Sequence, residues 1–302
     1  MKIAITGGTG FIGTRLVNHL IEQGHEAIIL TRNPQQQPKK ENVTYVKWLQ
    51  EDATPEKELE GIQAVYHLAG ESIGNKRWTA NQKEKILKSR IDSTRALMSI
   101  LSKLNKKPNT LISASAIGFY GNSESAIFTE KDEPVDESFL TTVVGEWEKE
   151  VAKAQELGIR TVYARLGIVL HPKEGALKQM LLPYKLGIGG PLGSGKQWFS
   201  WVHIQDVISL FYFVLLKAEI DGPVNFTSPN PTQMNEFGRT IGSVINRPHW
   251  IPIPGLVMKL LLGEMSTLVI DGQKVLPNQA LLHEYQFQYP HLKQALTDLL
   301  QE

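Results

Sequence analysis

The start of the chain constrains its fold most, because a short apolar run leads directly into glycines at a fixed spacing. Residues 2–6 read as a β-strand, and Gly7, Gly10 and Gly13 follow in the pattern G-x-x-G-x-x-G before an amphipathic helix predicted over 13–23. The first glycine permits a tight turn, the second a close approach of the backbone to a pyrophosphate, and the third close packing of helix on strand. The helix N-terminus would present free N–H groups to the phosphates. We therefore predict a dinucleotide site, with a merely structural glycine turn as the alternative. The expected contacts from this loop are Gly7, Thr9, Gly10, Phe11, Ile12 and Gly13.

Short β-branched runs alternate with longer helical patterns over the first two-thirds of the chain. This alternation predicts βαβ units, and hence an α/β fold with a Rossmann-like, doubly wound parallel sheet. The further strands are expected over 27–31, 43–48, 64–68, 110–113, 161–168 and 224–227, and the longer helices over 80–104 and 143–157.

The character of the chain changes after residue 170. Residues 171–200 are rich in Gly and Pro, and the helices expected after residue 235 are short and interrupted by prolines. We predict a nucleotide-binding domain from residues 1–170 and 201–229. A smaller C-terminal substrate-binding domain would comprise residues 171–200 and 230–302.

The balance of charge and the lack of cysteine narrow the function. The 302 residues include 32 Lys+Arg and 31 Asp+Glu, a net charge of +1, which argues against a nucleic-acid partner. No cysteine is present, so thiol catalysis and thiolate metal sites are excluded, and no other metal-ligand pattern is found. The longest uncharged apolar stretch, 207–216, is half the roughly 20 residues that span a bilayer. We expect a cytoplasmic protein with no membrane partner.

The end of the second strand bears on which dinucleotide is bound. An Asp or Glu there would bind the adenosine ribose hydroxyls of NAD, but the chain has Thr31 followed by Arg32. A guanidinium matches a 2′-phosphate, and the threonine hydroxyl could add a hydrogen bond. We therefore predict NADP(H) in preference to NAD(H). The alternative is that Arg32 is a solvated loop residue.

The end of the fourth strand is expected to border the cofactor. Small residues there let the adenosine and ribose pass close to the backbone, so Leu68, Ala69 and Gly70 are expected contacts. Glu71 is either a ribose or substrate ligand or a solvated acid. A basic stretch follows, and Arg77 is the member that we expect to contact a phosphate, although such runs are usually solvated.

Together with the glycine loop, several segments resemble the extended short-chain dehydrogenase/reductases, the NAD(P)-dependent epimerase/dehydratase superfamily. They are similar to its atypical epimerase-family subgroup, which has a short C-terminal domain of unknown function. The resemblance implies an NADP-dependent oxidoreductase or epimerase acting on a small, sugar-like molecule. It also implies a homodimer formed through two long helices, although the charged faces of those helices leave the oligomeric state open. The segments that carry the resemblance are 68–71, 89–95, 113–121, 189–197 and 201–206.

The catalytic set that the resemblance implies is incomplete in this chain. The superfamily uses a Ser or Thr after strand five and Tyr-x-x-x-Lys on the next helix, but Val144 and Glu148 occupy the Tyr and Lys positions. Valine cannot transfer a proton, and a glutamate would raise the pKa of a neighbouring phenol. Ser115 remains at the serine position. Tyr120 is the candidate replacement proton donor, with packing of the sheet end as the alternative, and Val144 could still cover the nicotinamide.

Two residues of the later segments are candidate substrate contacts. Gln197 ends a glycine-rich loop and His203 follows a group of aromatic residues, which could stack on a ligand or seal a domain boundary. Arg165 is equally an ion-pair residue or a substrate clamp. Because the Tyr-x-x-x-Lys pair is missing, a non-catalytic NADP(H)-binding or redox-sensing protein is the alternative to an enzyme.

Overall fold

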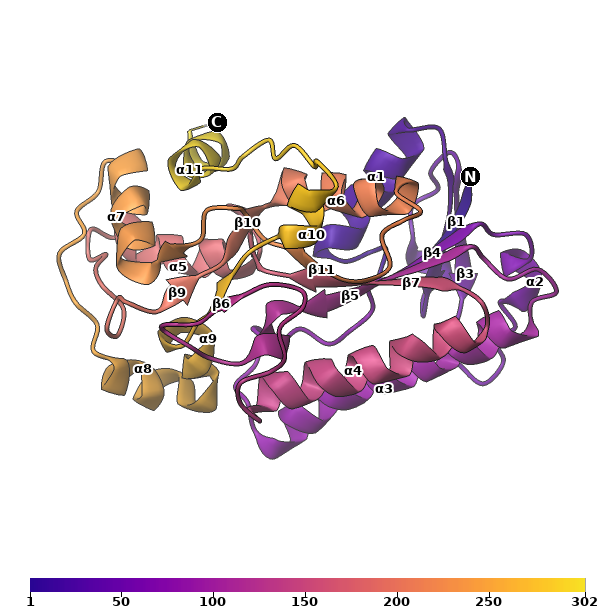
Figure 1. The fold of residues 1–302 in the computed structure, drawn as a ribbon, viewed down its shortest axis with the longest axis horizontal. Coiled ribbons are helices and arrows are strands. Elements are labelled where there is room, and N and C mark those ends of the chain that lie inside the picture. The colour runs from indigo at the N-terminus through magenta and orange to yellow at the C-terminus, as the bar shows by residue number, and fades with distance from the viewer. Residues whose placement is uncertain (302) are drawn as a thin grey trace.

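The computed structural model describes residues 1–301, which fold around a seven-stranded sheet of parallel strands (Figure 1). The strand order is β11-β7-β5-β4-β1-β2-β3. This confirms the predicted Rossmann-like, doubly wound class. The strands are β1 (Lys2–Thr6), β2 (Glu26–Thr31), β3 (Val43–Lys47), β4 (Ala64–His67), β5 (Thr110–Ala116), β7 (Arg160–Leu166) and β11 (Gly222–Phe226).

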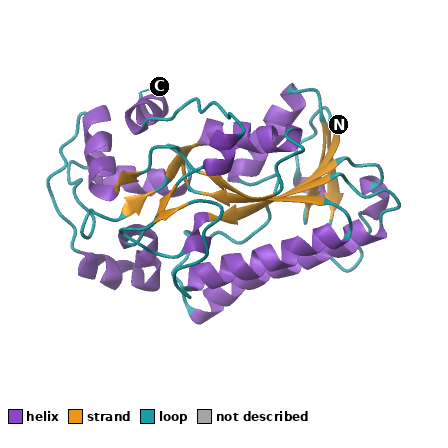
Figure 2. Cartoon of the chain, in the orientation of Figure 1, coloured by secondary structure: helices purple, strands orange, loops and turns teal. Residues whose placement is uncertain are grey.

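Helices cover both faces of the sheet, as Figure 2 shows. On one face α1 (Phe11–Glu22) and α6 (Ile204–Leu216) enclose a core with the sheet, and on the other α3 (Ala80–Lys103) and α4 (Phe139–Glu156) enclose a second. The short α2 (Glu56–Leu59) precedes β4. The strand order reverses between β1 and β4, and ligands of such sheets bind beyond the carboxyl ends of strands at that point.

One predicted strand divides in two. Instead of a single strand over 161–168, β7 ends at Leu166 and β8 (Ile168–Leu170) pairs with β10 (Trp201–His203) outside the central sheet. Gly167 joins the two strands. This position requires a glycine, because a Cβ there would lie 2.5 Å from the carbonyl oxygen of Ser200. The other predicted strands and the long helices are present, with ends shifted by a few residues.

Most of the remaining elements gather beyond the carboxyl ends of the strands, whereas α10 (Asn278–Leu282) packs against β11. Their third core includes Leu177, Trp201, Phe237 and Leu296. A long-range strand pair joins β13 (Lys274–Val275) to β6 (Ile127–Phe128), so the C-terminal region contacts the segment that follows β5. The division into two domains stays a prediction. The elements are η1 (Pro34–Gln36), η2 (Ile117–Tyr120), β6 (Ile127–Phe128), α5 (Gly175–Lys185), β9 (Trp198–Phe199), β12 (Thr232–Gln233), α7 (Met234–Val244), α8 (Gly255–Leu262), η3 (Gly263–Ser266), α9 (Thr267–Ile270), β13 (Lys274–Val275), α10 (Asn278–Leu282) and α11 (Leu292–Leu300).

Within residues 1–301, the helices are all too short or too polar to cross a membrane.

Candidate functional site

The glycine loop is compact and leaves the start of α1 open. Gly7 has a φ of 70°, and a Cβ there would lie 2.7 Å from the carbonyl carbon of Leu68. A Cβ on Gly13 would lie 2.1 Å from the carbonyl oxygen of Gly7. With any side chain at position 13, therefore, the helix could not pack as closely on the strand as it does. Gly10 caps α1, and no side chain among the described residues caps its N–H groups. Thr9 and Gly10 are exposed, whereas Phe11 and Ile12 are half-buried. This arrangement fits a dinucleotide pyrophosphate.

The end of β2 carries a cation without a protein partner. Arg32 is exposed, and within residues 1–301 its guanidinium forms no hydrogen bond or ion pair. Its main-chain carbonyl accepts a hydrogen bond from Nε2 of Gln50, at 2.9 Å. Thr31 is half-buried, and its Oγ1 accepts a hydrogen bond from the amide of Asn33. Both side chains can therefore meet a ligand at this edge.

A buried polar network holds the end of β4. Oγ1 of Thr6 accepts hydrogen bonds from the amides of Leu68 and Ala69, both at 3.2 Å, so its own proton is directed to Nδ1 of His67, 2.7 Å away. The proton of the imidazole therefore lies on Nε2, 3.0 Å from Oγ1 of Thr94. Burial lowers the pKa of His67 to about 3, so the ring is neutral. The network fixes the backbone at Leu68 and Ala69.

The next two residues are held by α3. A Cβ on Gly70 would lie 3.4 Å from Cζ of Arg90, whose Nη1 donates to the main-chain oxygen of Glu71 at 3.1 Å. The amide of Glu71 donates to Oγ of Ser89 at 2.9 Å, and its carboxylate accepts from Nε2 of Gln82 at 3.3 Å. Glu71 is thus positioned by α3 rather than freely solvated.

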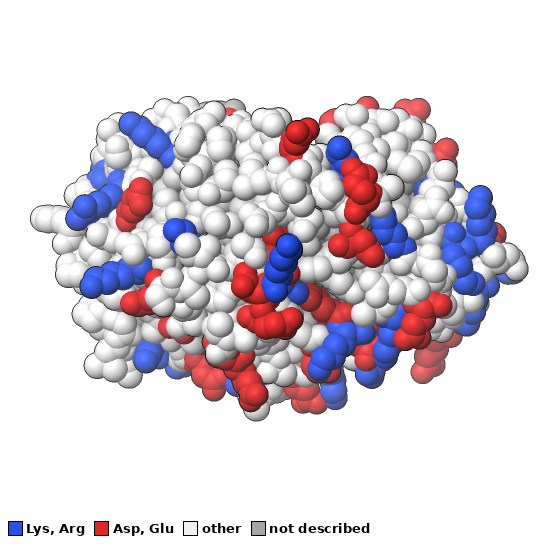
Figure 3. All heavy atoms as spheres, viewed as in Figure 1, with Lys and Arg blue, Asp and Glu red and all other residues white. Residues whose placement is uncertain are grey.

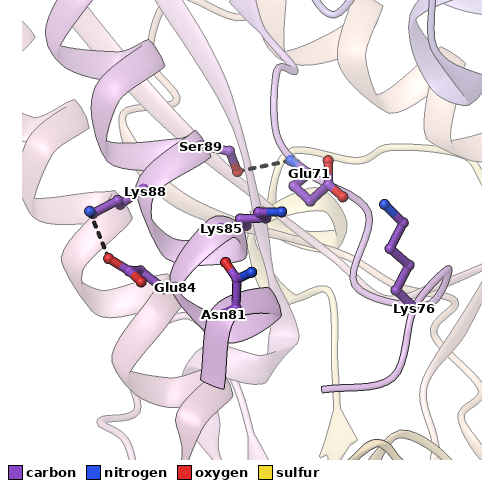
Figure 4. A pocket seen from close by; sticks show the side chains of 7 residues that line it. All are labelled: Glu71, Lys76, Asn81, Glu84, Lys85, Lys88 and Ser89. Carbon is purple, nitrogen blue, oxygen red and sulfur yellow. Dashed lines mark hydrogen bonds and ion pairs between the residues drawn. The ribbon is translucent and has the colours of Figure 1, made fainter. Parts of the chain in front are cut away.

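An open depression of about 540 Å³ adjoins Glu71 (Figure 4). Lys88 is paired with Glu84 at 2.7 Å, whereas Lys76 and Lys85 form no ion pair with any described residue. Arg77 is not part of this depression. Its Nη2 donates to the carbonyl oxygen of Leu260 in α8, at 3.4 Å. The lining residues are Glu71, Lys76, Asn81, Glu84, Lys85, Lys88 and Ser89.

A buried ion pair lies at the carboxyl ends of β5 and β7. Arg165 donates to Glu148 twice, from Nε to Oε1 at 2.9 Å and from Nη2 to Oε2 at 2.8 Å, and the two side chains are 5% and 12% exposed. Ser115 donates to the same Oε1 at 2.5 Å. Ser115 and Arg165 are directly opposite in the strand register. The position that carries Lys in the resembling superfamily thus holds a carboxylate fixed by an arginine and a serine.

Tyr120 belongs to the same network. Its ring is completely buried and stacks on Phe128, and its hydroxyl accepts from Nη1 of Arg165 at 3.0 Å and donates to Oδ1 of Asn225 at 2.8 Å. Burial raises the pKa of Tyr120 to about 12. Its role as a proton donor stays a prediction. Val144 is buried one helical turn before Glu148 on α4.

The two candidate substrate contacts are buried and already bonded within the protein. Gln197 Nε2 donates to the carbonyl oxygens of Leu192 and Val269, at 3.0 and 2.9 Å. His203 caps α6 by accepting from the amide of Gln205 at Nδ1, and its Nε2 lies 3.2 Å from Oδ2 of Asp298. Burial lowers the pKa of His203 to about 4. Contact of either residue with a substrate stays a prediction.

Sequence reasoning missed the pairing of Glu148 with Arg165, although it considered both residues. The one signal in the sequence was an arginine near the end of a predicted buried strand, where a charge needs a partner; the partner itself depends on the strand register and on how α4 lies against it. Among residues 1–301 no group of three or more His, Cys, Asp or Glu side chains is placed to hold a metal ion.

Two family descriptions match this chain. The NAD dependent epimerase/dehydratase family matches residues 3–226, and a domain of unknown function, DUF1731, matches residues 253–299. Epimerase family protein YfhF of Bacillus subtilis (strain 168) is 47% identical over 300 residues, which are 99% of this chain and 98% of YfhF. Epimerase family protein SA0724 of Staphylococcus aureus (strain N315) is 42% identical over 298 residues, 99% of this chain and 98% of the relative.

Solved structures agree with these matches. Human epimerase family protein SDR39U1 (isoform 2), solved with NADPH, has a TM-score of 0.88 and 31% identity, and the alignment covers 100% of both chains. The nucleoside-diphosphate sugar epimerase of Corynebacterium glutamicum has a TM-score of 0.79 and 28% identity over 99% of this chain and 58% of that one. The chain therefore belongs to the NAD-dependent epimerase/dehydratase family and carries the C-terminal domain of unknown function in addition.

Proposed function

We propose that this protein is an NADP(H)-dependent, epimerase-like oxidoreductase that acts on a small, sugar-like molecule. The observation that carries the proposal is the buried contact of Ser115 with Glu148. Ser115 lies near the carboxyl end of β5, and β4 alone separates β5 from β1 and its open glycine loop. The similar structures that contain NADPH, or are named for a nucleoside-diphosphate sugar, support the cofactor and the substrate class.

The chain offers a binding group for each part of the dinucleotide. The N–H groups at the start of α1 would bind the pyrophosphate, with Thr9 and Gly10 beside it. Arg32 would bind a 2′-phosphate, assisted by Thr31, which accounts for a preference for NADP(H). The chain from Leu68 to Glu71 would border the adenosine and ribose, and Val144 would cover the nicotinamide. Arg77, bonded to α8, would reach a phosphate only by leaving Leu260.

The Ser115–Glu148 contact supplies a path for a proton. When bound, the nicotinamide accepts a hydride from an alcohol carbon or returns it to a carbonyl carbon. As an alcohol is oxidised, its hydroxyl proton would pass to Oγ of Ser115 while the serine proton passes to Oε1 of Glu148. The return step uses the same atoms in reverse. Arg165 holds the carboxylate in position. The hydroxyl of Tyr120 contacts Nη1 of Arg165, so the guanidinium separates it from Glu148.

The C-terminal residues would form the substrate side of the site. In this proposal residues 171–200 and 230–302 are the substrate-binding domain. Gln197 holds the glycine-rich loop to α9 through Val269, and His203 caps the start of α6, so both would shape the cleft through the segments they fix.

A non-catalytic, NADP(H)-binding or redox-sensing role is the second candidate. Two observations favour it: Val144 occupies the position of the superfamily's catalytic tyrosine, and the hydroxyl of Tyr120 donates within the protein, to Asn225. Such a protein would bind the dinucleotide without turnover.

A kinetic experiment separates the two candidates. Purified protein is mixed with NADPH and carbonyl compounds, or with NADP⁺ and sugar alcohols, and the absorbance of the reduced cofactor is followed. The enzyme proposal predicts turnover that Ser115→Ala lowers at least about a hundredfold with unchanged NADPH affinity. Ser113→Ala, on the same strand, should retain activity. NADPH binding without turnover across the panel would instead support the sensing role.

A further inference from the structure

Helix α8 and the segment before it expose large apolar side chains. Leu256, Leu260 and Leu261 are 70%, 71% and 66% exposed, and none of the eight residues of α8 is buried. Trp250, in the segment before α8, is 67% exposed. An amphipathic helix in a globular core would bury such a face. We call the following exposed side chains the apolar band: Leu182, Leu186, Ile188, Trp250, Ile251, Leu256, Val257, Leu260 and Leu261.

Hydrogen bonds make the band continuous. Nε1 of Trp250 donates to the carbonyl oxygen of Gly187 at 2.9 Å, and the amide of Gly193 donates to Ile253 at 2.9 Å, so the two segments run side by side. On α5 the exposed residues Lys178, Leu182 and Leu186 recur every fourth position and form one solvent-facing stripe.

The segments that carry the band hold more cations than acids, and the nearest acid beyond α8, Glu264, is already paired with Lys83. Residues 175–200 and 230–262 contain a single acidic residue, Glu236. Their cations are all exposed, and within residues 1–301 none forms an ion pair. On α3 and α4, by contrast, opposite charges alternate and pair, as along the lower edge of Figure 3, whereas the left end of that view shows separate blue side chains and few red ones. The cations are Lys178, Lys185, Lys196, Arg239, Arg247 and Lys259.

We propose that the apolar band and its cations dock onto the surface of a lipid bilayer that contains anionic lipids. Leucine and tryptophan side chains at the interface enter the acyl boundary, and the surrounding lysines and arginines bind the anionic headgroups. A second copy of this chain is a poorer occupant, because a symmetric contact would bring the same unpaired cations face to face. The expectation of no membrane partner rests on the lack of a stretch long enough to span a bilayer. Docking at the bilayer surface does not require such a stretch.

This proposal is independent of the proposed function and concerns a different surface. The link between them is structural: α8 and η3 contact the loop after β4 through Arg77 and the start of α3 through the ion pair of Lys83 with Glu264, at 2.6 Å. Docking would therefore hold the edge of the candidate site close to the bilayer.

Vesicle sedimentation of the full chain tests the proposal. We expect the protein to pellet with vesicles of phosphatidylcholine and phosphatidylglycerol, and at least about tenfold less with phosphatidylcholine alone or in high salt. Leu256→Glu/Leu260→Glu should lower binding to the anionic vesicles at least about tenfold, and Lys178→Glu/Lys259→Glu should do the same. Leu282→Glu, at a residue 73% exposed on α10, is the matched control and should bind as the unchanged protein does.

The outcomes are distinct. Affinity for NADPH or the unfolding temperature shows that each variant is folded. Failure of the folded protein to pellet with anionic vesicles, or equal pelleting of Leu256→Glu/Leu260→Glu, would overturn the proposal. A dimer in sedimentation equilibrium that Leu256→Glu/Leu260→Glu dissociates would overturn it in favour of a second copy. An acidic peptide bound by the band without vesicle binding would also overturn it.

Discussion

Glu148 and Arg165 are joined by two hydrogen bonds of 2.9 and 2.8 Å beneath the carboxyl edge of the sheet. The geometry is that of a planar guanidinium facing both oxygens of a carboxylate, the strong form of this interaction. Ser115 and Tyr120 contact opposite ends of the pair. A lysine at position 148, as in the Tyr-x-x-x-Lys pair of the superfamily, would place a second positive charge against Arg165. The glutamate at 148 and the arginine at 165 therefore depend on each other.

Breaking this pair should destabilise the protein strongly. Arg165→Met leaves a buried carboxylate without its partner, and we expect the free energy of unfolding to fall by about 3 kcal/mol. Urea denaturation measures it. Glu148→Leu/Arg165→Met should recover most of the loss, because neither charge then remains buried.

The matched control is Arg95→Met. Arg95 pairs with Glu150 at 2.7 Å, but its side chain is 62% exposed and screened by water, so Arg95→Met should change the free energy of unfolding far less than Arg165→Met. An equal loss for Arg95→Met and Arg165→Met would contradict the importance of burial.

The choice of cofactor should depend on Arg32. Removing the exposed guanidinium in Arg32→Ala deletes the expected charge-assisted contact with the 2′-phosphate, so the affinity for NADPH should fall about tenfold or more, and that for NADH should change little. Fluorescence titration with both cofactors measures the difference. Arg247→Ala, another exposed arginine, should leave both affinities unchanged. Equal weakening of NADPH and NADH by Arg32→Ala would refute the NADP(H) preference.

The central fold follows from local patterns in the sequence. The strand, glycine turn and helix at residues 2–22 combine short-range periodicity with glycines at required positions, and the structure confirms their order. The break at Gly167 could not be predicted, because it depends on contact with Ser200, thirty-three residues later in the chain.

The candidate site was only partly predictable for a similar reason. The phosphate loop is a local motif, whereas the pairing of Glu148 with Arg165 depends on how α4 lies across β7. Gln197 and His203 are polar residues in a loop-rich region, a pattern typical of exposed contacts. Gln197 is buried where it bonds to Val269 and His203 where the ring of Tyr289 packs on it, and no local pattern reveals either partner.

Gly13 should tolerate no side chain. A Cβ there would lie 2.1 Å from the carbonyl oxygen of Gly7, so Gly13→Ala must separate α1 from the loop. We expect a loss of stability of about 1–3 kcal/mol together with weaker NADPH binding, measured by thermal unfolding with and without cofactor. Gly145→Ala is the control. It lies inside α4 with no atom within 4 Å of its added Cβ, and should stabilise the helix by about 0.5–1 kcal/mol.

The buried imidazole of His67 should make stability depend on pH. Burial disfavours the charged ring and lowers the pKa of His67 to about 3 in the folded protein, against the ordinary histidine value of 6.5. Between these values the unfolded chain binds more protons at this residue, so the free energy of unfolding should decrease as the pH falls, by up to about 1.4 kcal/mol per pH unit. Denaturation of the protein and of His67→Gln at pH 6 and pH 4 measures the contribution, and the variant should show the shallower slope. His291→Gln, at an exposed histidine, should keep the slope of the unchanged protein. If His67→Gln kept that slope too, the ring would not be the neutral link between Thr6 and Thr94 that the hydrogen bonds describe.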